Sequence, residues 1–107
     1  MSLDFSLHAV RSTEVYSGNI THNLGAMANK AGIYKCLWRP EENGFKKAEQ
    51  IIPILKTGIE KLKKSPAKYK KYDSPNGWGL YEHFVPFVEE ILKACEENPD
   101  AEIRSSV

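Results

Sequence analysis

Residues 3–9 read Leu3-Asp4-Phe5-Ser6-Leu7-His8-Ala9, in which apolar and polar side chains alternate without interruption. A period of two is typical of a β-strand with one buried face, because successive side chains of a strand point to opposite faces. A shorter alternation runs from Ala101 to Ser106, close to the other end of the chain. We therefore expect one strand near each end, and each has little to pair with except the other.

Two longer stretches between these strands carry apolar residues at the spacing of amphipathic helices. In the first, Pro53 is expected in the opening turn, where no backbone N–H is needed, so the helix should begin near Glu49 or Gln50. In the second, at about 80–97, Pro86 lies in the first turns or marks a kink. The apolar positions are Ile51, Ile52, Leu55, Ile59 and Leu62 in the first helix, and Leu80, Phe84, Phe87, Val88, Ile91, Leu92 and Cys95 in the second.

A further helix is predicted after the N-terminal strand. The turn-forming run Ser17-Gly18-Asn19 is expected to break the chain, with Asn19 or Thr21 as the helix cap. Gly32 suits the left-handed residue that follows a helix end. The apolar face of this helix would consist of Ile20, Leu24, Met27 and Ala31.

A short helix at 66–72 and loops at 39–44 and 73–79 complete the pattern. The sequence thus predicts an α+β fold, mainly helical, with three to five helices packed on a small sheet of the N- and C-terminal strands. A chain of 107 residues is expected to form one domain, residues 1–107. A two-stranded sheet is marginal alone, so it must pack on the helices or continue across a homodimer through its open edge.

The composition is ordinary for a globular protein. The hydrophobic fraction is 41%, and the longest apolar runs are far shorter than a membrane span. Asp4 stands where a secretory signal would carry basic residues, so we expect a cytoplasmic location. Cys36 and Cys95 occur in different contexts and are expected to be reduced, packed thiols.

The charges are segregated along the chain. Residues 46–71 hold nine lysines against Glu49 and Glu60, and residues 73–102 hold eight acidic residues against Lys93 alone. Lysines interleaved with tyrosines are compatible with nucleic acid binding. The net charge of +1 and the acidic last helix favour solvated or mutually paired faces instead, so nucleic acid is not the expected partner.

The first candidate binding segment is Tyr16 to Asn23. If this segment opens a helix, Asn19 and Asn23 lie along one flank of its apolar face. Their amides both donate and accept hydrogen bonds, which suits the recognition of a nucleobase or a peptide. The alternative is structural, with Asn19 as the helix cap and Asn23 bonded to a nearby loop.

Two tryptophan segments are the next candidates, Trp38-Arg39-Pro40-Glu41-Glu42 and Asn76-Gly77-Trp78-Gly79. Tryptophan and arginine are common anchors of binding hot spots, and Arg39 can hold a carboxylate or phosphate with two hydrogen bonds. Trp78, between two glycines, can stack on a planar ligand. The structural alternatives are Trp38 in the core beside an internal Arg39–Glu pair, and Trp78 as a plug at one end of the helices.

Catalysis and metal binding have less support. His22 as a general base needs a partner and a substrate proton, and Glu41 or Glu42 would have to orient it. The spacing of His8, His22 and His83 is not that of a metal site, and we expect no metal and no cofactor. The sequence contains no nucleotide-binding loop and no nucleophile motif.

Four segments together resemble a family of small proteins from bacteria and their phages. They are Val15-Tyr16-Ser17-Gly18-Asn19-Ile20-Thr21-His22-Asn23-Leu24, Met27-Ala28, Leu37-Trp38-Arg39-Pro40-Glu41-Glu42 and Asn76-Gly77-Trp78-Gly79. The likeness covers nearly the whole chain. It implies an intracellular protein, bacterial or phage-encoded, and no particular reaction. Small phage proteins often bind host proteins or sequester small molecules, which is an analogy.

We therefore predict a small, non-catalytic binding protein. Its ligand would be a planar or phosphorylated small molecule of a nucleotide-like kind, or a peptide. The alternative is a protein–protein interaction module, dimeric through its terminal strands, that inhibits or adapts a host protein. An enzyme with His22 as the base is the third hypothesis. The predicted binding residues are Tyr16, Asn19, Asn23, Trp38, Arg39 and Trp78.

Overall fold

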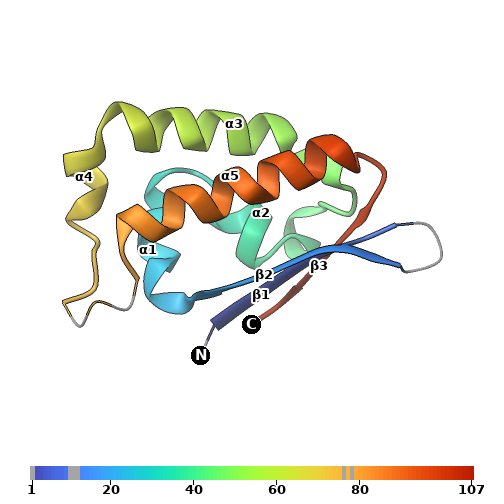
Figure 1. Cartoon of the computed structure of the whole chain (residues 1–107), viewed down its shortest axis with the longest axis horizontal. Coiled ribbons are helices and arrows are strands. Elements are labelled where there is room, and N and C mark those ends of the chain that lie inside the picture. The colour runs from blue at the N-terminus through green and yellow to red at the C-terminus, as the bar shows by residue number, and fades with distance from the viewer. Residues whose placement is uncertain (1, 10–12, 76, 78) are drawn as a thin grey trace.

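The computed structural model describes residues 2–9, 13–75, 77 and 79–107 of the chain. Figure 1 shows two layers, with the helices on one side of a small sheet. The described residues contain five α-helices, so the predicted α+β fold, mainly helical, is confirmed. The elements are β1 (Ser2–His8), β2 (Glu14–Thr21), the 3₁₀ turn η2 (His22–Leu24), α1 (Gly25–Lys30), α2 (Tyr34–Trp38), the 3₁₀ turn η3 (Glu41–Asn43), α3 (Ala48–Lys64), α4 (Pro66–Lys70), α5 (Tyr81–Glu97) and β3 (Glu102–Ser106).

The strands form one antiparallel sheet in the order β2–β1–β3. The central strand β1 pairs with β3, with Leu7 opposite Ile103, so the predicted pairing of the terminal strands is confirmed. On its other edge β1 pairs with β2, with Leu7 opposite Tyr16. The expectation that the terminal strands pair only with each other is therefore wrong.

Strand β2 replaces the chain break predicted at Ser17-Gly18-Asn19. A Cβ atom on Gly18 would lie 2.7 Å from the Tyr16 hydroxyl oxygen and 3.0 Å from a ring carbon of Phe87. Gly18 is therefore needed because α5 packs closely against the strand at this position, and it does not form a turn. Pairing with β1 satisfies the backbone groups along the inner edge of this segment, which overrides the local preference of these residues for turns.

Of the two helix caps predicted after the N-terminal strand, Asn19 and Thr21, the structure has Thr21. Thr21 ends β2, and its Oγ1 accepts a hydrogen bond from the backbone N–H of Asn23 at 3.3 Å. Thr21 and not Asn19 therefore caps the first helical turn, η2. Gly32 follows α1 with a φ of 81°, the left-handed conformation that the sequence predicts after the helix end.

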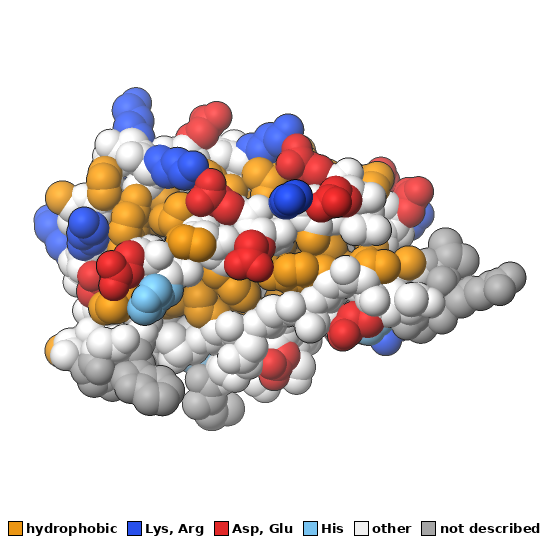
Figure 2. All heavy atoms as spheres, viewed as in Figure 1, with side chains coloured by type: hydrophobic (Ala, Val, Ile, Leu, Met, Phe, Trp, Pro, Cys, Tyr) orange, Lys and Arg blue, Asp and Glu red, His pale blue; other side chains and the backbone are white. Residues whose placement is uncertain are grey.

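The two long helices lie side by side above the sheet (Figure 1). Lys63 Nζ lies 2.7 Å from Glu89 Oε2, and Lys56 Nζ lies 3.5 Å from Glu96 Oε2. The basic and acidic parts of the chain thus pair within the fold, and Figure 2 shows both charge types interspersed over the helix layer. Pro53 lies beyond the first turn predicted for it, because α3 begins at Ala48.

The core lies between the helices and the covered face of the sheet. Both cysteines are free and buried in it. None of the described helices combines the length and the apolar character needed to cross a membrane. The fully buried core side chains include Leu3, Phe5, Leu7, Leu24, Met27, Ile33, Leu37, Ile51, Leu55, Leu62, Phe84, Val88 and Ile91.

Candidate functional site

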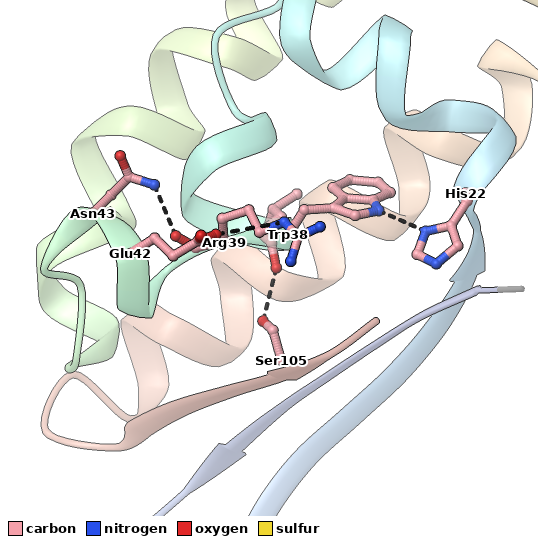
Figure 3. Close-up of polar contacts among 7 residues, drawn as sticks. His22, Trp38, Arg39, Glu42, Asn43 and Ser105 are labelled. Carbon is pink, nitrogen blue, oxygen red and sulfur yellow. Dashed lines mark hydrogen bonds and ion pairs between the residues drawn. The ribbon is translucent and has the colours of Figure 1, made fainter.

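A hollow of about 470 Å³ opens where the end of α2 meets the exit of β2. Trp38 and Arg39 come from the end of α2, and His22 comes from η2. Ser105 of β3 holds the end of α2 in place, because its Oγ donates a hydrogen bond of 2.7 Å to the Leu37 carbonyl oxygen (Figure 3). The hollow is lined by His22, Gly25, Ala26, Tyr34, Trp38, Arg39 and Val107.

Trp38 forms the back of this hollow. Its ring stacks on that of Tyr34, with 5.4 Å between the centroids and 13° between the planes. The two residues are four positions apart, one turn of α2, which brings their side chains to the same face of the helix. Only 3% of Trp38 is exposed, so most of the indole belongs to the core and one part of it faces the hollow.

The Trp38 indole also fixes the state of His22. Its Nε1–H donates a hydrogen bond of 2.9 Å to Nδ1 of His22 (Figure 3). An indole N–H is always a donor, so Nδ1 must be unprotonated and the neutral ring carries its proton on Nε2. His22 therefore presents a hydrogen-bond donor at Nε2, whereas a general base needs an unprotonated nitrogen.

Arg39 supplies a cation at the rim. Its side chain is 47% exposed, and Nε lies 3.5 Å from Oε2 of Glu42. Its carbonyl oxygen accepts a hydrogen bond of 2.8 Å from Nδ2 of Asn43, which ties η3 to the end of α2 (Figure 3). Exposed ion pairs contribute about 0–1 kcal/mol, so an anionic ligand can replace Glu42 as the partner of Arg39 at small cost.

The structure brings only part of the predicted cluster together. Trp38 and Arg39 line one hollow, and both features of the structural alternative for this segment are also present, because Trp38 is buried in the core and Arg39 pairs with Glu42. Tyr16 lies on the covered face of β2, where burial and the nearby carboxylate of Glu90 raise the pKa of its phenol. Asn19 is an odd number of positions away, so its side chain lies on the opposite face of the strand. Tyr16 and Asn19 therefore cannot line the same hollow.

The two asparagines do not share a helix flank, because Asn19 belongs to a strand. Nδ2 of Asn19 donates to Asp4 Oδ1 at 2.6 Å and to Ser2 Oγ at 2.9 Å, both on the neighbouring strand. Asn23 is exposed, and a Cβ atom on Gly79 would lie 2.9 Å from its Cβ. Asn23 thus lies against the end of the Asn76–Gly79 segment, and Trp78 lies outside the described residues.

Sequence reasoning missed Tyr34, Gly25, Ala26 and Val107. The spacing of Tyr34 and Trp38 within a short helix was the available signal for their stack. His22 does reach this cluster, but its partner is the Trp38 indole, whereas the enzyme hypothesis required Glu41 or Glu42 to orient it. Glu42 pairs with Arg39.

No family model, no curated protein and no solved structure matches this chain. Among the residues that the structure describes, no three His, Cys, Asp or Glu side chains gather where they could hold a metal ion. The argument for a function therefore rests on the geometry of the hollow beside Trp38.

Proposed function

We propose that this protein is a non-catalytic binding protein whose hollow beside Trp38 takes a planar, negatively charged group. One observation carries the proposal: the stacked rings of Tyr34 and Trp38 share a hollow with His22, whose Nε2 is a donor, and with the cationic Arg39. Aromatic faces favour a flat ligand, and the two donors favour an anion. No acidic side chain lines this hollow within the described residues.

The size of the hollow fits this proposal. About 470 Å³ lies within the range of small-molecule sites, which is about 300–1,000 Å³. An aromatic phosphate or carboxylate has the required shape and charge, and so does a nucleoside monophosphate. The anion would lie beside Arg39 and displace Glu42 from it.

The proposal is tested by NMR with two probes, phenyl phosphate and adenosine 5′-monophosphate. The indole N–H signal of Trp38 is assigned by its loss in Trp38→Phe. We expect this signal to shift and to saturate as probe is added, because the ligand lies against the indole that holds His22. A signal that stays unchanged while either probe is added to millimolar concentration would overturn the proposal.

Charge variants locate the anion. Arg39→Gln should weaken binding by about tenfold or more, because a charge-assisted hydrogen bond is lost. Glu42→Gln should bind at least as tightly as the wild type, because the internal competitor is gone. Lys56→Gln is the matched control, since Lys56 is also exposed and also lies 3.5 Å from a glutamate, on α3. Equal losses in Arg39→Gln and Lys56→Gln would mean that net charge alone governs binding.

A protein–protein interaction module is the second candidate function. It is favoured by β2, which is an edge strand and carries no charged residue from Val15 to Thr21. Such an edge is a template for pairing with another chain, either a host protein or a second copy. Sedimentation velocity over a range of concentrations separates these two partners, because only a homodimer forms in the purified protein.

A further inference from the structure

The outer edge of β2 is the unprotected edge of the sheet. β2 is an outer strand, and residues 15–21 include no charged residue and no proline. Among the described residues, no backbone hydrogen bond from another segment reaches this edge. The edge of β3 is different, because Ile103 N–H donates a hydrogen bond of 2.8 Å to the Lys46 carbonyl oxygen, and the strand carries Glu102 and Arg104. Proteins usually guard exposed edges with charge or with a covering segment, so β2 is the edge that can accept another strand.

The residues of β2 that face the helices are incompletely buried. Tyr16 lies opposite Leu7 of β1, and Ile20 lies opposite Leu3. Leu3 and Leu7 are fully buried, whereas Tyr16 and Ile20 are half-buried. Figure 2 shows hydrophobic side chains along the boundary between the helix layer and the sheet. A strand added beside β2 would cover the side of Tyr16 and Ile20 that the fold leaves open to water.

The sequence of β2 is complementary to itself about Gly18. In an antiparallel pair of two copies with Gly18 opposite Gly18, Tyr16 lies opposite Ile20 of the second copy, which is an aromatic and β-branched pair on the covered face. On the other face Ser17 lies opposite Asn19. Both hydrogen bonds that Asn19 makes to β1 leave from Nδ2, so the Ser17 hydroxyl can donate to its Oδ1.

Other centres of symmetry give poorer pairs. A centre at Ser17 places Ile20 opposite Glu14, which sets an apolar side chain against a charged one. A centre at Asn19 places Ile20 opposite Gly18, which has no side chain for it to contact. Gly18 at the centre is therefore the register that matches apolar with apolar and polar with polar side chains.

We propose that a second copy of this chain pairs with β2 in antiparallel orientation about a two-fold axis at Gly18, which forms a continuous six-stranded sheet. The paired residues are 16–20. The pairing ends there because Gly79 adjoins the next residue, Thr21. The two-fold axis is perpendicular to the sheet, since opposite residues belong to the same face. This inference rests on the second candidate function, and it names the partner as a second copy and fixes the register.

The dimer is tested first in the wild type. Sedimentation velocity should show a monomer–dimer equilibrium that moves toward the dimer as protein concentration rises. Amide exchange followed by NMR should slow with concentration at alternate residues of β2, because the dimer covers the N–H groups that point away from β1. A monomer that persists to millimolar concentration would overturn the proposal, and so would exchange in β2 that does not depend on concentration.

The register is tested with nitroxide spin labels on Ser17→Cys and, as the matched control, Ser106→Cys. Both serines are exposed on the uncovered face of the sheet, and the buried Cys36 and Cys95 should stay unlabelled. The proposed register places the two Ser17 Cα atoms about 8 Å apart and the two Ser106 Cα atoms about 25 Å apart, from the usual strand spacing and rise.

Samples that sediment as dimers should therefore show strong dipolar broadening of the electron paramagnetic resonance spectrum with the label at Ser17 and none at Ser106. Broadening at Ser106, or at neither position, would overturn pairing at Gly18. The two proposed functions fail separately in these tests. If phenyl phosphate shifts the Trp38 signal of a protein that stays monomeric, the binding of a planar anion stands and pairing through β2 fails. If the dimer forms and the Trp38 signal does not respond, the reverse holds.

Discussion

The indole Nε1–H of Trp38 points at Nδ1 of His22 and is 2.9 Å from it, although the two residues lie sixteen positions apart. This bond joins the end of α2 to the turn that follows β2. It also determines that Nε2 is the donor nitrogen of the neutral His22 ring. The same contact therefore holds the two segments together and sets which His22 nitrogen can donate a hydrogen bond.

The first prediction concerns the strength of this contact. A double-mutant cycle with Trp38→Phe and His22→Ala should give a coupling free energy of about 0.5–1.5 kcal/mol, the usual net contribution of an internal hydrogen bond. Urea unfolding of the wild type, the two single variants and the double variant measures it. Additive effects of the two substitutions would show that the bond contributes nothing in solution.

The second prediction concerns the buried thiols. Burial raises the pKa of Cys36 and of Cys95 from 9.0 to about 12, so both thiols stay protonated near neutral pH. Because the thiolate is the reactive form, neither should react with iodoacetamide in the folded protein at pH 8, whereas both should react in urea. Mass spectrometry counts the added groups. Rapid labelling of either cysteine in native buffer would contradict the structure.

The third prediction is the effect of pH on stability. Between pH 9 and about 12 the unfolded chain loses thiol protons that the folded chain keeps, so the folded state binds more protons and the free energy of unfolding falls as pH rises. The raised pKa of Tyr16 acts in the same direction above pH 10. Urea midpoints at pH 8 and pH 10.5 should show the decrease. Cys95→Ala should show a smaller decrease, and an unchanged slope in that variant would exclude the thiol as a cause.

The fourth prediction concerns the contact of α3 with the segment before α2. Gly58 lies inside α3, where alanine would usually stabilise the helix by about 1 kcal/mol. A Cβ atom there would overlap Cγ2 of Ile33, so Gly58→Ala should instead destabilise the protein by about 1–3 kcal/mol.

Ile33→Ala, which removes the overlapping atom, provides the control for Gly58→Ala. The double variant should lose less stability than the sum of the two single variants, as measured by urea unfolding. If the two losses of stability were additive, the destabilisation by Gly58→Ala would not come from a clash with Ile33. Gly44→Ala is not a suitable control, because Gly44 has a φ of 76° and is strained by any Cβ atom.

The two kinds of sequence pattern predicted the fold to different extents. The apolar spacing of Ile51, Leu55, Ile59 and Leu62 belongs to α3 alone, so one segment contained all the information for that helix. In β2 the alternation is weak, because Gly18 occupies a covered position and Ser17 and Asn19 favour turns. Its strand conformation depends on β1, which lies elsewhere in the sequence, so a local reading predicted a turn.

The residues of the site were also predicted only as far as local sequence allows. Trp38 and Arg39 were predicted because their chemistry is distinctive wherever they lie. Tyr34 was missed, and Asn19 was wrongly grouped with Trp38 and Arg39. The direction in which a side chain points depends on whether its residue belongs to a helix or to a strand. A residue assigned to the wrong element is placed on the wrong face.

The sequence by itself determined the two long helices, the terminal strands and the identity of the aromatic and cationic residues, because these follow from local periodicity and side-chain chemistry. Only the tertiary structure decided that β2 completes the sheet, that His22 meets Trp38, and that Ser105 of β3 bonds the end of α2. Each of these depends on contacts between segments far apart in the chain, whose free energy exceeds the local preferences that a sequence shows.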